Sequence, residues 1–158
     1  MKGDPRVVEA LNGLLADELT AVNQYMVHAE MCDNWGYGKL HKEIEKKAID
    51  EMHHAEWLIG RILFLEGMPI VSKLNPMKIG PGIKEMIAND QAAEVGAIKS
   101  YNDAITLGHE VKDQGSVDLL MKILADEERH EDWAEAQLDQ IGQMGFENYL
   151  TNQTKGAA

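Results

Sequence analysis

The chain has 158 residues, 44% of them apolar and 27% charged, which is ordinary for one globular domain and argues against a disordered or fibrous chain. Its 27 acidic residues outnumber 15 Lys and Arg, and the resulting net charge of −12 argues against a nucleic-acid partner. A single cysteine, Cys32, excludes an internal disulfide, and no apolar run reaches the about 18 residues that span a bilayer. We expect one cytoplasmic domain, residues 1–158, without a membrane or nucleic-acid partner.

Apolar residues recur at steps of three and four along four long segments, and this spacing predicts four amphipathic helices. The first begins at Asp4-Pro5, because the carboxylate can cap a helix and proline suits its first turn. Glycine-rich breaks separate the segments. The predicted helices span about 5–34, 39–66, 83–112 and 116–144, with a short fifth helix at about 146–151.

Residues 67–82, between the second and third helices, contain three prolines and three glycines and do not form a helix. A helix of about 28 residues is about 42 Å long, whereas 16 extended residues reach about 50 Å. This segment can therefore run the full height of a bundle, while the two short breaks produce antiparallel hairpins. We predict an all-α, four-helix bundle in which one long crossover joins two antiparallel hairpins.

The two halves of the chain match at an offset of 76 residues. Glu18 falls on Glu94, and Asp50–Trp57 falls on Asp126–Trp133 with Asp, Glu, His and Trp at the same places. In each half, a Glu-x-x-His motif follows the single Glu by 33 residues. The hairpin therefore occurs twice, and we expect a pseudo-twofold site.

Six residues of this repeat have the chemistry of metal ligands and stand on the otherwise apolar stripes. An unpaired carboxylate in a core costs several kcal/mol, so four together persist only if protons or cations neutralise them. Four carboxylates and two neutral imidazoles balance two divalent cations, and this oxygen-rich set suits iron or manganese better than zinc. One Glu-x-x-His alone would favour a surface salt-bridge face, but two equivalent copies favour a dimetal site. The expected ligands are Glu18, Glu51, His54, Glu94, Glu127 and His130.

With these ligands in this order the chain resembles the ferritin family over nearly its whole length, and Met52, directly after Glu51, makes it similar to the bacterioferritin branch. The resemblance implies that a di-iron centre within each subunit oxidises Fe²⁺ to Fe³⁺ with dioxygen or peroxide, in a hollow shell of twenty-four copies that stores the mineral. It assigns Glu18 and His54 to one iron, Glu94 and His130 to the other, and Glu51 and Glu127 to both. It also implies a b-type haem shared by two subunits through Met52, and a ferredoxin-like electron donor for iron release.

Several further positions have two interpretations. Met52 is a haem ligand or an ordinary apolar interface residue, and Tyr25 is an electron or hydrogen-bond partner of the site or a core tyrosine. Asp50 and Asp126 either serve the site, by orienting the ligands or by guiding iron to or from it, or belong to a solvated face. Lys46 stands where some relatives carry an iron-binding histidine, and this puts an accessory iron site on the cavity wall in doubt. We expect Tyr101 and Trp133 to be core residues, and His28 to pack at the surface or at an interface.

Other functions would use the same ligands. A di-iron or di-manganese redox enzyme, such as a peroxidase, would stop at two metals per chain and store nothing. A DNA-protecting mini-ferritin places its metal between subunits, so a complete ligand set in one bundle and the charge of −12 oppose it. A metal-free structural bundle would leave four buried carboxylates without neutralisation. Iron storage is the expected function.

Overall fold

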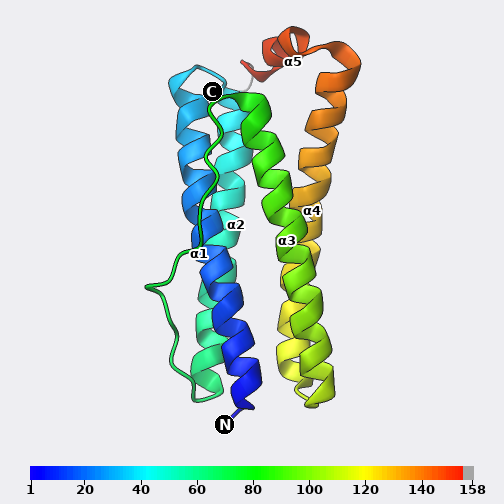
Figure 1. The fold of residues 1–158 in the computed structure, drawn as a ribbon. Coiled ribbons are helices and arrows are strands. Elements are labelled where there is room, and N and C mark those ends of the chain that lie inside the picture. Colours follow the sequence, from blue (N-terminus) through cyan, green and yellow to red (C-terminus); the bar gives the residue numbers. More distant parts are fainter. Residues whose placement is uncertain (155–158) are drawn as a thin grey trace.

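The computed structural model describes residues 1–154, and the last four residues of the predicted domain lie outside this range. Within residues 1–154 the elements are α1 (Pro5–Asn34), α2 (Gly38–Phe64), α3 (Ile83–Glu110), α4 (Gln114–Met144) and α5 (Phe146–Gln153), with no strand. The four long helices stand side by side, and α5 lies across one end (Figure 1). The predicted all-α bundle with a short C-terminal helix is confirmed. None of these helices has the length and apolar character to cross a membrane.

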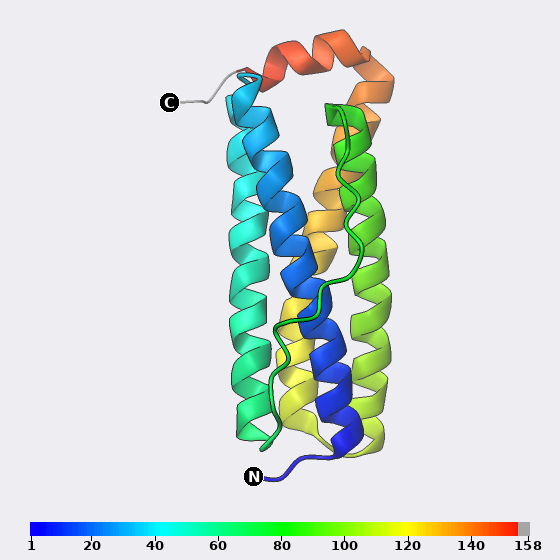
Figure 2. The ribbon, with the colours of Figure 1, turned by 60° about the vertical axis from the view of Figure 1, so that its left-hand side comes forward.

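The long crossover passes from the lower end of α2 across α1 to the upper end of α3 (Figure 2). Its backbone N–H groups have no ladder partners, so they need other acceptors. Four side chains spaced by four or eight residues on one face of α1 accept them. The pairs are Ile70 to Asn12 (2.9 Å), Asn75 to Thr20 (2.8 Å), Lys78 to Gln24 (3.1 Å) and Gly80 to His28 (3.0 Å). Polar side chains of α1 therefore determine the path of the crossover.

Five helix ends differ from the predicted ones: α2 begins one residue early, α5 ends two residues late, and three other ends differ for reasons that the structure shows. The helices α2 and α3 end two residues early, because Glu66 (φ 61°) and Lys112 (φ 59°) take the left-handed conformation. The next residues, Gly67 and Asp113, then donate their N–H groups to carbonyls five residues back, at 2.9 and 2.8 Å. The helix α4 begins two residues early, because the Asp113 side chain accepts the Ser116 N–H at 3.0 Å and caps it.

Two apolar clusters form the core, one in each half of the bundle. The lower cluster includes Leu11, Leu58 and Leu120, and the upper includes Ile44 and Ile87, all almost fully buried. Burial of each such side chain contributes roughly 2 kcal/mol, so the two clusters supply the stabilisation that a polar layer cannot. The predicted metal ligands occupy the layer between them, half-way along the four long helices.

Candidate metal centre

All six predicted ligands meet in one buried layer, and none is more than 6% exposed. The helix α1 supplies Glu18, α2 supplies Glu51 and His54, α3 supplies Glu94, and α4 supplies Glu127 and His130. Their ligand atoms form two groups, and within each group every atom lies within 4.8 Å of the others. One group is Glu18, Glu51, His54 and Glu127, and the other is Glu51, Glu94, Glu127 and His130. Glu51 and Glu127 belong to both groups, so the geometry suits two ions with shared carboxylates.

Each of these six residues has one buried atom without a hydrogen-bond partner. The atoms are Glu18 Oε2, Glu51 Oε1, His54 Nδ1, Glu94 Oε2, Glu127 Oε1 and His130 Nδ1. Some lie close together, such as His54 Nδ1 and Glu127 Oε1 at 3.1 Å, but their orientation is not that of a hydrogen bond. Buried polar atoms without partners are rare and costly in native proteins. Six that converge from six residues fit a pair of cations.

Protons compete with cations at this centre. Burial, followed by the charges of Glu18 and Glu127, raises the pKa of Glu51 well above its usual value. Burial also raises the pKa of Glu94 to about 7. Burial alone would lower the pKa of His54, but the carboxylates of Glu127 and Glu18 outweigh it and raise the pKa to about 9. Without metal, the cluster therefore retains protons near neutral pH, and divalent cations must displace them.

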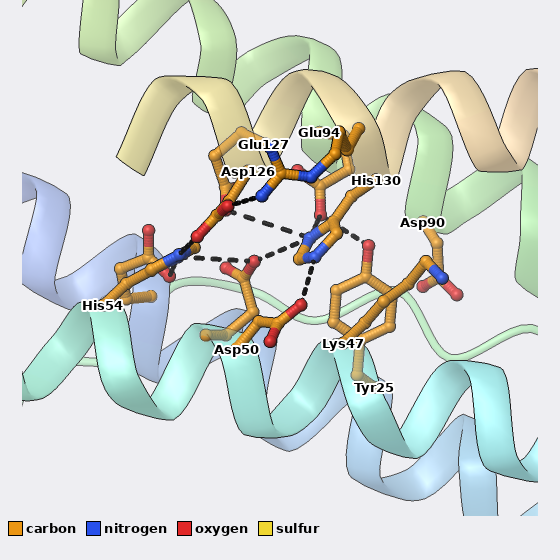
Figure 3. Close-up of polar contacts among 12 residues, drawn as sticks. Tyr25, Lys47, Asp50, His54, Asp90, Glu94, Asp126, Glu127 and His130 are labelled. Atoms are coloured by element: carbon orange, nitrogen blue, oxygen red, sulfur yellow. Dashed lines mark hydrogen bonds and ion pairs between the residues drawn. The ribbon is translucent and has the colours of Figure 1, made fainter. Parts of the chain in front are cut away.

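Each histidine of the centre is oriented by an aspartate of the other hairpin (Figure 3). His54 Nε2 lies 2.7 Å from Asp126 Oδ2, and His130 Nε2 lies 2.9 Å from Asp50 Oδ2. Because a carboxylate accepts, Nε2 of each imidazole donates, and Nδ1 points to the glutamates, where its lone pair becomes available to a cation once the cation displaces the proton. Metal-binding histidines commonly use such an outer carboxylate. Of the two interpretations of these aspartates, the orienting one holds.

Two tyrosines hold the outer carboxylates in the same reciprocal way. Tyr25 donates its hydroxyl to Glu94 Oε1 and Tyr101 donates to Glu18 Oε1, both at 2.5 Å. Burial and the facing carboxylate raise the pKa of both tyrosines, so each hydroxyl remains a donor. Tyr101 is the expected core residue, and its hydroxyl also holds a ligand of the centre, because the repeat places it as it places Tyr25. An electron-transfer role of Tyr25 stays a prediction.

A pocket of about 340 Å³ leads to the centre between α1 and α3. The crossover forms its outer wall with Asn75 and Pro76, and Thr20 and Gln24 of α1 line its side. All four glutamates of the centre contribute to its floor. The carboxylates of the centre therefore border a space large enough for a small ion or oxidant.

Comparison with known proteins agrees with this geometry. A family model described as a ferritin-like domain matches residues 8–144, which contain all six predicted ligands. Bacterioferritins of Brucella melitensis, Rhodobacter capsulatus and Mycobacterium leprae are 42%, 43% and 40% identical to this chain over 149 residues. These matches cover 94%, 92% and 94% of this chain, and 92%, 92% and 94% of the relatives. The chain belongs to the bacterioferritin family.

Two buried polar residues of this bacterioferritin chain were missed or misjudged from the sequence. His28 is fully buried rather than at the surface, and its Nδ1 lies 2.9 Å from Asp90 Oδ1 while its Nε2 accepts the Gly80 N–H. Lys47 is 5% exposed, with Nζ 3.8 Å from the centre of the Trp133 ring. Both residues stand on an apolar stripe of their helix, and this position in the sequence could have indicated that they are buried.

The predicted haem ligand of this bacterioferritin chain lies on the outside of α2. Met52 is 44% exposed, although it directly follows the buried Glu51, because successive helix residues point about 100° apart. Ile49 on the same helix and Met26 on α1 are exposed to a similar degree. Haem ligation by Met52 stays a prediction. Lys46 is also exposed, and Cys32 is fully buried as a small apolar residue.

Proposed function

We propose that this chain stores iron, by oxidising Fe²⁺ at the six-residue centre and depositing Fe³⁺ as mineral inside a shell of twenty-four copies. The six buried ligand atoms without hydrogen-bond partners carry this proposal. Membership of the bacterioferritin family supports storage over a redox enzyme of the same fold that stores nothing.

Two Fe²⁺ ions held side by side supply one electron each to the two-electron reduction of an oxidant, dioxygen or peroxide. Four carboxylates balance the charge of the two ions, and Glu51 and Glu127 are placed to bind both. Asp126 and Asp50 keep Nδ1 of the two histidines directed to the ions, and the two tyrosines keep the outer glutamates in place. Binding of the ions releases the protons that the metal-free cluster holds.

The proposal extends to the surroundings of the centre. The exposed Met52, with Ile49 exposed on the same helix and Met26 exposed on α1, supports a b-type haem held between two subunits by a Met52 from each. Release of the stored iron needs electrons, which we assign to a ferredoxin-like donor. The lone, buried Cys32 suits a reducing compartment, and we place the shell in the cytoplasm.

Iron uptake tests the proposal. Fe²⁺ is added aerobically to the metal-free protein, and ferric absorbance and particle size are followed together. We expect a large shell that keeps far more than two irons per chain in solution, and loss of uptake in Glu51→Ala and His130→Ala. Glu128→Ala, at an exposed position of α4, is the matched control and should keep full uptake. Saturation near two irons per chain in a small oligomer would favour the redox enzyme.

A further inference from the structure

The centre repeats its ligands, aspartates and tyrosines in two halves, but the lysine beside each half is buried to a different extent. In one half, Lys47 on α2 is 5% exposed and its Nζ lies 3.8 Å from the centre of the Trp133 ring. In the other half, the Nζ of Lys122 on α4 lies 4.0 Å from the centre of the equivalent Trp57 ring, but Lys122 is exposed. The offset of 76 residues pairs Lys47 itself with Ile123, which is fully buried. One half of the centre therefore has a buried lysine nearby where the other half has an exposed one.

The ammonium group of Lys47 is held in place and charged. Its Nζ lies 3.8 Å from the centre of the Trp133 ring and donates to the Glu43 carbonyl oxygen at 3.4 Å. Burial lowers the pKa of Lys47 to about 8, while the charges of Glu43, Glu94 and Asp50 favour its protonated form. Lys47 is therefore a cation at neutral pH that bulk water screens little.

Apart from Glu43 on its own helix, the carboxylates that favour the charged form of Lys47 belong to one half of the centre. Glu94 is a predicted ligand of that half, and Asp50 orients its histidine, His130. Figure 3 shows Lys47 beside Tyr25 at the His130 end of the cluster, with His54 at the opposite end. A divalent cation bound by Glu94 and His130 is consequently nearer to this ammonium than one bound at the other end.

We propose that Lys47 makes the two half-sites unequal, by weakening cation binding at the Glu94–His130 half relative to the Glu18–His54 half. Repulsion between the ammonium and a divalent cation is strong in a poorly screened interior and decreases with distance. The first cation then occupies the Glu18–His54 half, and the second binds about tenfold more weakly and leaves first. This inference rests on the proposed dimetal function, but its cause is a residue outside the ligand set.

An anaerobic titration of the metal-free full-length chain with Co²⁺, followed by visible absorbance and calorimetry, tests the inference. The wild type should bind two Co²⁺ per chain in two steps that differ about tenfold in affinity. Lys47→Met keeps the apolar stem on Trp133 and removes the charge, so the second step should tighten about tenfold while the first changes less than about twofold. Lys46→Met removes the same charge from an exposed neighbouring position and should change neither step.

Three further variants assign the two binding steps and guard against misfolding. Glu18→Gln should weaken the tight step and Glu94→Gln the weak one, and Lys47→Gln repeats the neutral substitution should Lys47→Met not fold. Equal steps in the wild type, or an unchanged second step in both neutral Lys47 variants, would overturn the role of Lys47 while leaving the dimetal centre intact. A wild type that binds fewer than two Co²⁺ per chain would overturn the proposed function, and the half-site inference with it.

Discussion

Removal of metal should leave a protein whose stability falls as the pH rises from 6 to 8. In the metal-free protein, the pKa of Glu94 is raised to about 7 and that of His54 to about 9. The folded state then holds protons that the unfolded chain has released, so the free energy of unfolding decreases as the pH rises. For each group this stabilisation is complete below the pKa of the unfolded chain and is lost as the pH passes the folded pKa.

The expected loss of stability is about 3 kcal/mol. One proton held only by the folded state changes the free energy of unfolding by about 1.4 kcal/mol per pH unit. Between pH 6 and 8, Glu94 contributes over about one unit and His54 over about one and a half. Glu51 and His130, whose pKa values are also raised, act in the same direction. Lys47, with its pKa lowered to about 8, begins to oppose them near pH 7, but most of its effect lies above pH 8.

Calorimetric melting of the metal-free protein at pH 6, 7 and 8 measures this loss. For a chain of this size, about 3 kcal/mol corresponds to a fall in Tm of about 6–12 °C. Excess Co²⁺ should abolish the slope, since cations replace the protons. Glu94→Gln should reduce the slope, whereas Glu128→Gln, at an exposed position of α4, should not. A metal-free Tm that stays level or rises between pH 6 and 8 would refute the reasoning.

Two further predictions concern residues that hold a metal ligand or the long crossover in place. Asp126→Asn removes the carboxylate that accepts from His54 Nε2, and it should weaken Co²⁺ binding at the Glu18–His54 half about 10- to 100-fold. Unchanged binding would show that Asp126 does not orient His54. Thr20→Val leaves the Asn75 N–H of the crossover without its acceptor and should lower the free energy of unfolding by about 1–3 kcal/mol. Limited proteolysis should then cut residues 67–82 of the variant faster than those of the wild type. Equal rates of cleavage in the two proteins would contradict this.

The helices and ligands of this chain were predictable because both depend on local spacing. Steps of three and four place Glu18 on the same helix face as Leu11 and Leu15, so a carboxylate in the core is visible in the sequence. The ends of α2 and α3 could not be predicted in this way, because Glu66 and Lys112 are not residues typical of the left-handed conformation. Their turns depend on hydrogen bonds and packing that no local pattern encodes.

The partners of the ligands were less predictable, because they depend on how the two hairpins pack. Asp126 lies on α4 and its histidine, His54, lies on α2, 72 residues away in the sequence. Helical spacing identifies the face of each helix but not which face it meets, so the two interpretations of Asp126 stayed open. The same limit applies to His28, whose acceptor, Asp90, lies on α3.

The differences between the two halves explain why identical ligands need not bind identically. Besides Lys47, the upper half of the core buries His28 and Asp90, and the offset of 76 residues pairs these two with Ala104 and Leu14. Ala104, Leu14 and Ile123 all belong to or pack within the lower apolar cluster, next to the Glu18–His54 half. A cation at that half therefore has apolar core neighbours, and the cationic side chains at its Trp57 and Asp126, Lys122 and Arg129, are exposed and screened by water. A cation at the other half has buried polar neighbours, of which the Asp90 carboxylate attracts it and the Lys47 ammonium repels it. The repeat thus supplies two matched ligand sets, and the residues that break it determine how tightly each one holds its ion.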